Sequence, residues 1–190
     1  MDARELILGR HSVRDFLPNP IPKDIINEIL EAGRLAPSTQ NRQPWRYLVF
    51  SENAKIRKLA LNCGLIGLSN FFIRKAPCLI IACADLKDNV KINGQDYYLV
   101  DTAISFHQIL LFARNYGIES CWLAAFSEKK LKGYLKLPAQ WKIVAMAPWD
   151  ILLRKKDYIP KQLAVLPKVK IESHWKQLSV LCKNPSIHRI

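Results

Sequence analysis

The sequence predicts a single layered domain that mixes α-helices with about four β-strands. Its 190 residues are 49% hydrophobic, which is enough for one sizeable core. Four apolar runs have the length of strands, and the segments between them place apolar residues at helical spacing. No internal repeat, low-complexity segment or domain boundary interrupts this order, so we expect one domain over residues 1–190.

The first part of the chain is predicted to form two helices and a strand. Asp2 followed by Glu5 is a capping-box pattern and predicts a short first helix. A proline-rich stretch then predicts extended backbone, and apolar spacing from Lys23 onward predicts a helix that Pro37 stops. After a loop, residues 46–50 are predicted to be a buried strand.

The middle of the chain is dominated by one buried strand and one long helix. Residues 78–84 are wholly apolar and predict the strand. The longest helical pattern covers residues 97–116, and Gly117 follows at the position of a C′ glycine. Before these elements, residues 53–62 predict a helix, whereas residues 64–75 fit no single pattern.

Two further strands and a long tail complete the prediction. Residues 120–125 predict a third strand, Ser127 caps a helix after it, and residues 142–147 predict a fourth strand. The tail, about residues 148–190, has little periodicity and cannot bury much of itself. It should therefore pack on another surface, such as a partner subunit. The core is expected over about residues 1–147.

Composition argues against several classes of protein. The net charge of +13 attracts polyanions, but the basic residues are scattered and form no zinc-finger spacing, RNP-type motif or basic-region heptad. A solvated basic surface is therefore favoured, and nucleic acid is not expected as a partner. No apolar run reaches the roughly 18–20 residues that span a bilayer, and the N-terminus lacks the order of a signal peptide. We expect a soluble, cytoplasmic protein with no membrane contact.

The five cysteines form no C-x-x-C pair, and their odd number argues against a disulfide framework. Most lie in apolar stretches, where a cysteine is usually a small buried hydrophobe. Because there are only four histidines, none at ligand spacing from the cysteines, we expect no metal site.

A basic segment near the N-terminus, R-H-S-V-R, has the donors that a phosphate needs. Guanidinium, hydroxyl and backbone N–H groups together bind a phosphate monoester well. On an extended backbone the side chains of Arg10, Ser12 and Arg14 would leave the chain on one face. A solvated basic turn that only follows the first helix remains the alternative.

A second polar segment lies one helix later, where residues 37–45 read P-S-T-Q-N-R-Q-P-W. This segment resembles the P-S-x-x-N-x-Q-P-W pattern of the nitroreductase family, and its spacing from R-H-S-V-R-D-F is similar too. Residues 101–104 and 117–122, at the start and end of the long predicted helix, look like two more landmarks of that family. The resemblance covers roughly residues 4–147, and four landmarks in order are far more specific than one.

This resemblance implies an α+β fold with three layers, in which helices flank a central, mostly antiparallel sheet of four to five strands. It implies a homodimer that binds FMN in two active sites shared between the subunits, with the C-terminal tail packed on the partner. The implied activity is reduction of nitroaromatics, quinones or similar acceptors by NADPH or NADH.

The resemblance also implies cofactor contacts, residue by residue. The residues that would hold the FMN phosphate, ribityl chain and pyrimidine edge are Arg10, His11, Ser12 and Arg14. The residues that would reach across the dimer are Pro37, Ser38, Thr39 and Asn41. The backbone expected against the flavin ring near N5 belongs to Leu123, Ala124 and Ala125, with Asn70 as a further ring contact. The basic pair that would complete the phosphate site is Lys168 and Lys170.

In such an enzyme the flavin carries the reaction, so no residue is assigned a dedicated catalytic role. Arg14 is the candidate for positive charge near N1 and O2 of the ring, and an open apolar slot predicts ping-pong kinetics. Two other functions remain open: a flavin enzyme of the same fold for ene reduction or dehalogenation, and a basic binding protein without turnover.

Several other residues have simpler interpretations. His107 is expected to be a core or interface histidine, and Trp45 and Trp122 are expected to be core aromatics. No Asp–His pattern accompanies the serines, so a hydrolase triad is not expected. After the fourth strand the family often has a Gly-[YF]-Pro turn, whereas residues 147–150 read A-P-W-D and predict a different turn.

Overall fold

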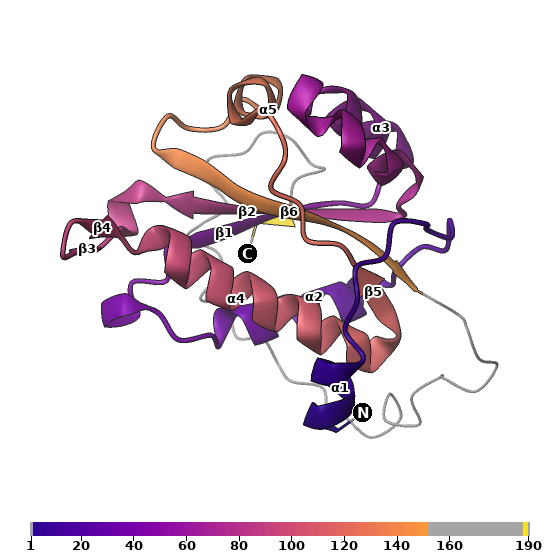
Figure 1. Cartoon of the computed structure of the whole chain (residues 1–190), viewed down its shortest axis with the longest axis horizontal. Helices are drawn as coiled ribbons and strands as arrows, with labels where there is room; N and C mark the ends of the chain where they lie inside the picture. Colours follow the sequence, from indigo (N-terminus) through magenta and orange to yellow (C-terminus); the bar gives the residue numbers. More distant parts are fainter. Residues whose placement is uncertain (1, 152–187, 190) are drawn as a thin grey trace.

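The computed structural model describes residues 2–151 and 188–189, and these residues form three layers (Figure 1). The helices are α1 (Ala3–Leu8), α2 (Lys23–Arg34), α3 (Asn53–Leu61), α4 (Tyr98–Ala113) and α5 (Glu128–Leu135), with 3₁₀ segments η1 (Thr39–Asn41), η2 (Leu65–Lys75), η3 (Leu86–Asp88) and η4 (Arg114–Tyr116). The strands are β1 (Trp45–Phe50), β2 (Cys78–Asp85), β3 (Lys91–Ile92), β4 (Gln95–Asp96), β5 (Ile118–Ser120), β6 (Trp141–Ile151) and β7 (His188–Arg189).

The central sheet has the strand order β5-β6-β2-β1-β7, and every neighbouring pair is antiparallel. Helices α2 and α4 lie on one face, and α3 and α5 lie on the other (Figure 1). The predicted α+β fold with a mostly antiparallel sheet of four to five strands is therefore confirmed.

The alternation of side chains along β2 explains why residues 78–84 of this strand are all apolar. Ile80 and Ala82 belong to the core under α2 and α4, whereas Leu79 and Ile81 belong to the core under α3 and α5. Because helices cover both faces of the sheet, neither face of β2 needs polar residues. All eight residues of the strand are buried.

Helices α2 and α4 approach each other closely at Gly33. A Cβ atom at this position would lie 2.4 Å from Cδ1 of Ile109 on α4. Beside the crossing, the Ser105 hydroxyl donates to the Gly33 carbonyl at 2.6 Å and lies 2.6 Å from the Tyr47 hydroxyl on β1. This buried chain of hydrogen bonds fixes both helices against the sheet.

The predicted helix boundaries are confirmed to within one or two residues except at the end of the long helix, where α4 ends at Ala113 and the 3₁₀ segment η4 covers the last three predicted residues. Asp2 and Glu5 form both hydrogen bonds of the capping box at the start of α1. The Ser127 side chain accepts the N–H of Lys130 at the start of α5. Gly117 has φ +68°, the left-handed conformation expected of a glycine after a helix.

Two strand predictions were wrong in length. The third strand was expected over residues 120–125, but β5 ends at Ser120, and beyond it Leu123 makes only an isolated bridge with Met146. Ser120 pairs with Trp149, so the next pair would place Cys121 opposite Pro148, which has no N–H to continue the ladder.

The fourth strand was expected to end at residue 147 and to turn there. Instead β6 continues straight through Pro148, Trp149 and Asp150 to Ile151. Trp149 pairs with Cys78 on one side and Ser120 on the other, and its side chain is fully buried. Burial of this large aromatic ring favours continuation of the strand over a turn.

Only two residues of the predicted tail after β6 are described. They form β7, which pairs with Leu48 and Val49 of β1 in the same chain. The prediction that the tail packs on a partner subunit therefore does not hold for these two residues, and the rest of the tail lies outside the described residues, as do Lys168 and Lys170. Within residues 2–151, no helix is long and apolar enough to cross a bilayer.

Candidate active site

The basic segment from Arg10 to Arg14 is extended and runs along the edge of β5. Ser12 forms a parallel bridge with Ser120, and the Val13 N–H donates to the Ser120 carbonyl at 3.1 Å. Arg10, Ser12 and Arg14 are exposed, whereas Val13 is half-buried. His11 and Asp15 are exposed too, so the emergence of the three side chains from one face stays a prediction.

The chain then leads from β5 directly to the backbone predicted to face a flavin ring. Leu123 N–H donates to the Met146 carbonyl at 2.8 Å, which fixes the segment to β6. The Asn70 side chain, 7% exposed, donates through Nδ2 to the Ala125 carbonyl at 2.7 Å. The structure thus brings Asn70 to the predicted ring segment, although 55 residues separate it from Ala125 along the sequence.

The donors at this place fit a flavin mononucleotide. Among the described residues, neither the Arg10 and Arg14 guanidiniums nor the backbone N–H groups of Ala124 and Ala125 have a hydrogen-bond partner in the protein. Exposed guanidiniums suit a phosphate, and unpaired backbone N–H groups suit the ring's N5 and O4 acceptors. His11 uses Nδ1 locally, 3.0 Å from the Gly9 carbonyl.

The second predicted segment forms a strained loop that starts at Pro37. Gln40, Asn41 and Gln43 have φ values of +51°, +55° and +48°, which are uncommon for residues other than glycine. The Ser38 hydroxyl accepts the Gln43 N–H at 3.0 Å and so closes the loop. Backbone strain of this kind is often found where a loop presents groups to a ligand.

Asp101 holds this loop against the first turn of α4. Its Oδ1 accepts both the backbone N–H and the hydroxyl of Thr39, each at 3.0 Å. The carboxylate is 2% exposed, and its Oδ2 has no hydrogen-bond partner among the residues described. Thr39 therefore serves to anchor the loop, and the exposed Asn41 accepts Nε2 of Gln43 through its Oδ1 at 2.9 Å.

The two predicted groups of cofactor residues lie at opposite ends of α4. Asp101, in its first turn, holds the loop at Thr39, whereas Arg114, directly after its last turn, contacts α1 just before Arg10. A helix of 16 residues is about 24 Å long. One chain does not bring Arg10 and Thr39 together.

Sequence reasoning missed three charged residues that organise the site: Arg114, Glu119 and Asp150. All three are largely buried. Arg114 and Glu119 pair with each other, but Arg114 reaches the Glu5 carbonyl 109 residues away and Asp150 reaches the Leu17 N–H 133 residues away, and no local spacing reveals these contacts.

The prediction that Trp122 is a core aromatic was wrong: it is 36% exposed and packs by one side on Phe106. His107 is exposed on α4, which leaves only the interface alternative of its prediction. An interface role for His107 stays a prediction.

The cysteines agree with the expected structural role where they are described. Cys63, Cys78, Cys83 and Cys121 are free and buried. Burial raises the pKa of Cys63 to about 11 and those of Cys78 and Cys83 to about 12, so these thiols stay protonated at neutral pH. Within the described parts of the chain, no group of three or more potential metal ligands occurs.

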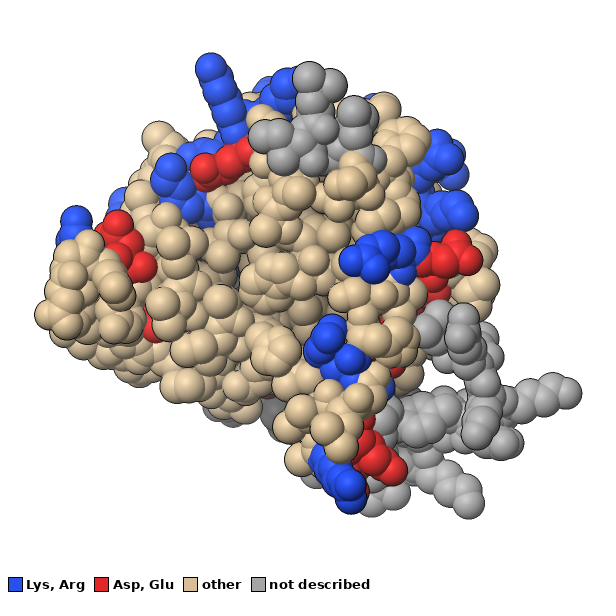
Figure 2. Space-filling view, in the orientation of Figure 1, with Lys and Arg blue, Asp and Glu red and all other residues tan. Residues whose placement is uncertain are grey.

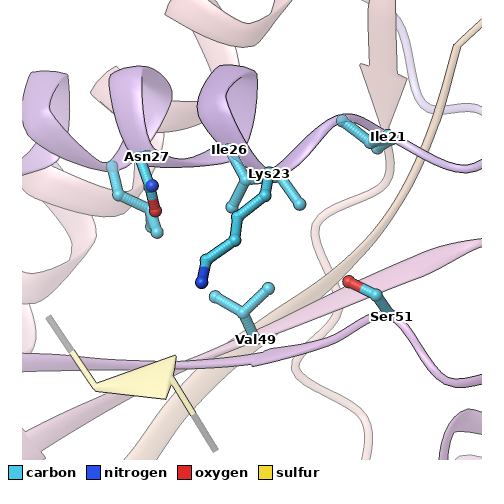
Figure 3. Close-up of a pocket in the computed structure, with 7 residues that line it drawn as sticks. Ile21, Lys23, Ile26, Asn27, Val49 and Ser51 are labelled. Carbon is cyan, nitrogen blue, oxygen red and sulfur yellow. The ribbon is translucent and has the colours of Figure 1, made fainter. Parts of the chain in front are cut away.

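A separate pocket opens between the start of α2 and β1 (Figure 3). Lys23 projects into it above Val49, with Ser51 at its margin and Ile26 on its wall. None of the predicted cofactor residues lines this pocket. It is distinct from the place where the basic segment and the ring segment meet.

Comparison with known proteins identifies the family. The Nitroreductase family model matches residues 7–64 and 65–149. A putative NADH dehydrogenase/NAD(P)H nitroreductase of Archaeoglobus fulgidus is 31% identical over 139 residues, covering 72% of this chain and 75% of that relative.

Solved structures have the same fold. A nitroreductase family protein from Clostridium novyi is 30% identical, with a TM-score of 0.72 over 80% of this chain and 85% of that one. An FMN-dependent nitroreductase from Clostridium difficile is 23% identical, with a TM-score of 0.69 over 86% of this chain and 97% of that one, and shows the fold alone. The order of landmarks, the sheet and these matches agree, and the chain belongs to the nitroreductase family of oxidoreductases.

Proposed function

We propose that the protein is an FMN-dependent oxidoreductase that uses NADPH or NADH to reduce nitroaromatics, quinones or similar acceptors. The observation that carries this proposal is the meeting of three separate segments at one place: the basic segment along β5, the Leu123–Ala125 backbone and Asn70. Each segment offers groups that suit a different part of a flavin mononucleotide.

Different residues of the site would bind different parts of FMN. Arg10 and Ser12 would hold the phosphate, and Arg14 would supply positive charge beside the pyrimidine edge of the ring. The N–H groups of Ala124 and Ala125 would bond the ring edge near N5. When bound, FMN would supply the hydride chemistry, taking a hydride from the nicotinamide and passing it to the acceptor. The chain need then provide only an open approach to the ring.

We infer further that two copies of the chain share two sites. Because the Thr39 loop and Arg10 lie at opposite ends of α4, a two-fold axis near the middle of this helix would place the loop of one copy beside the basic segment of the other. Asn41 could then reach the partner's cofactor.

The exposed face of α4 supports a second copy as its partner. Leu99, Val100 and Ile104 are each at least 40% exposed there, and this face carries few charges, with Lys and Arg mainly around its margin (Figure 2). Copies of a chain with net charge +13 repel one another, so they would associate through a face poor in charge.

The visible spectrum tests the enzyme proposal. The purified protein should be yellow, and the flavin bands should bleach when NADPH or NADH is added without oxygen. A colourless protein that does not take up added FMN would refute the proposal, and a yellow protein that neither donor bleaches would favour a binding role without turnover.

Sedimentation tests the dimer. The FMN-loaded protein should have about twice the mass of the 21.9 kDa chain. A single-chain mass for the loaded protein would contradict a shared site.

A further inference from the structure

We propose that Asp150 and the Arg114–Glu119 ion pair are positioning residues that hold the basic segment in the conformation that binds the FMN phosphate. This inference rests on the proposed function. The segment itself makes few contacts: Arg10, His11, Ser12 and Arg14 are all exposed, so its own side chains do not fix it. Three contacts with the rest of the chain, called anchors below, hold the segment in place.

The first anchor lies just before the segment. The buried Arg114 side chain donates through Nη1 to the carbonyls of Glu5 and Leu6, in the last turn of α1. The Glu5 carbonyl also accepts the Gly9 N–H at 3.0 Å, whereas the Leu6 carbonyl has no backbone donor among the described residues, so the guanidinium satisfies it. The guanidinium also places at the helix C-terminus the positive charge that is favoured there. A Cβ atom at Gly9 would lie 2.7 Å from Nη2 of Arg114, so the chain passes over the guanidinium closely.

Glu119 on β5 orients that guanidinium. Its carboxylate accepts Nε of Arg114 at 3.0 Å and 3.2 Å, and the two side chains are only 8% and 12% exposed. A pair this buried has little solvent screening, unlike the exposed pair between Lys75 and Asp15, the residue directly after the segment. The neighbouring residue, Ser120, provides the second anchor through its bond to Val13.

The third anchor lies at the end of the segment. Asp150, opposite Glu119 in the β5–β6 ladder, is fully buried, and its Oδ2 accepts the backbone N–H of Leu17. Its other oxygen, Oδ1, is buried without a hydrogen-bond partner in the described part of the chain. A buried carboxylate is costly, and its hydrogen bond here is to Leu17, three residues after the end of the basic segment. This role depends on β6 continuing past residue 147, where the sequence predicted a turn.

The affinity ratio of FMN to riboflavin measures positioning directly, because the two ligands differ only by the phosphate. Asp150→Ala should weaken FMN binding by about tenfold, corresponding to loss of one charged hydrogen bond at about 1.4 kcal/mol per tenfold, with riboflavin affinity little changed. Asp150→Asn keeps a carbonyl acceptor and should retain most of the ratio. Arg114→Lys keeps a positive charge for Glu119 but loses the second nitrogen group that bonds the α1 carbonyls. It should therefore also lower the FMN-to-riboflavin affinity ratio.

Asp85 offers a matched control. It is also a buried carboxylate, but its oxygens accept Trp141 Nε1 at 3.0 Å and the Lys87 N–H at 3.1 Å, away from the basic segment. Asp85→Ala should change stability without changing the FMN-to-riboflavin ratio.

Different failures have different meanings. If the unchanged protein binds riboflavin as tightly as FMN, the phosphate assignment in the proposed function is wrong. If it prefers FMN and both Asp150→Ala and Arg114→Lys keep that preference, the positioning role is wrong. Equal losses for both ligands would show a general loss of structure and would also overturn the inference. If Asp150→Ala does not fold, Arg114→Lys still decides the outcome.

Discussion

Removing the Asp101 carboxylate should release the loop that we propose reaches the partner's cofactor. Asp101→Ala deletes the acceptor of two hydrogen bonds from Thr39, its backbone N–H and its hydroxyl, both at 3.0 Å. A hydrogen bond to a charged group contributes about 1.5–3 kcal/mol, so the two together bring about 3 kcal/mol or more to holding the loop. Three residues with positive φ lie in this loop, so its conformation carries backbone strain that the contacts of Thr39 help to offset.

The expected result is weaker FMN binding. If the whole effect appears in binding, 3 kcal/mol corresponds to a roughly 100-fold rise in Kd, which flavin fluorescence quenching can measure. The substitution also removes the cost of burying a carboxylate whose Oδ2 is unpaired, and this offsets part of the loss. We therefore expect the Kd for FMN to rise by about 10–100-fold.

Substitutions of Thr39 test its contact with Asp101 in smaller steps. Thr39→Ala loses only the hydroxyl bond and should have a smaller effect than Asp101→Ala, whereas Thr39→Ser keeps both donors and should bind FMN nearly as the unchanged protein does. Wild-type FMN affinity in Asp101→Ala, with the fold intact by circular dichroism, would refute the proposed role of the loop.

Three further predictions concern the fold. Gly33→Ala should destabilise the protein by about 1–3 kcal/mol in urea unfolding, because the new Cβ would overlap Ile109, and a gain in stability would contradict the close helix contact. Cys78 and Cys83 should resist iodoacetamide at pH 8 in the native protein and react after unfolding, as peptide mass mapping can show; rapid native labelling would disprove their burial. Burial, followed by the charge of Asp15, raises the pKa of Asp150 above its unfolded value, so its contribution to stability is present at low pH and is lost as pH rises through the folded pKa. The stability of Asp150→Asn relative to the unchanged protein should therefore increase as pH rises above the ordinary pKa of an aspartate, about 3.9, and the opposite slope in urea midpoints would contradict the raised pKa.

Local patterns predicted the elements of the fold, because they depend on neighbouring residues. The capping box at Asp2, the left-handed glycine at position 117 and the apolar run of β2 each reflect a constraint within a few residues. The length of β6 could not be predicted in this way. A proline and polar Asp150 suggest a turn, and only pairing with β2 and β5 and burial of Trp149 make the strand continue.

The residues of the candidate site show the same difference between local patterns and long-range contacts. Residues that would touch the cofactor occur in compact motifs, so a resemblance could identify them from sequence. Residues that hold those motifs in place do not: Arg114 contacts carbonyls 108 and 109 residues away, and Asp150 contacts an N–H 133 residues away. Such contacts have no sequence spacing to recognise. The excess of basic residues in the sequence suggested only a solvated basic surface.

A shared site makes a prediction that a site within one chain does not, and mixed dimers can test it. Arg10→Ala damages the basic segment, and Asp101→Ala damages the loop at the other end of α4. In a mixed dimer, one site combines both damaged parts, and the other combines the intact basic segment of one copy with the intact loop of its partner.

Co-expression of the two variants should therefore restore activity that neither has alone. Random pairing makes half of the dimers mixed, and each has one intact site in two, so about a quarter of all sites should recover. If each chain held its own complete site, every site would carry one defect and mixing would restore nothing. Recovery in dimers purified through two different tags, with none in either parent, would assign Arg10 and the Asp101-held loop to opposite sides of one cofactor; the absence of recovery would exclude the shared arrangement whatever the mass of the particle.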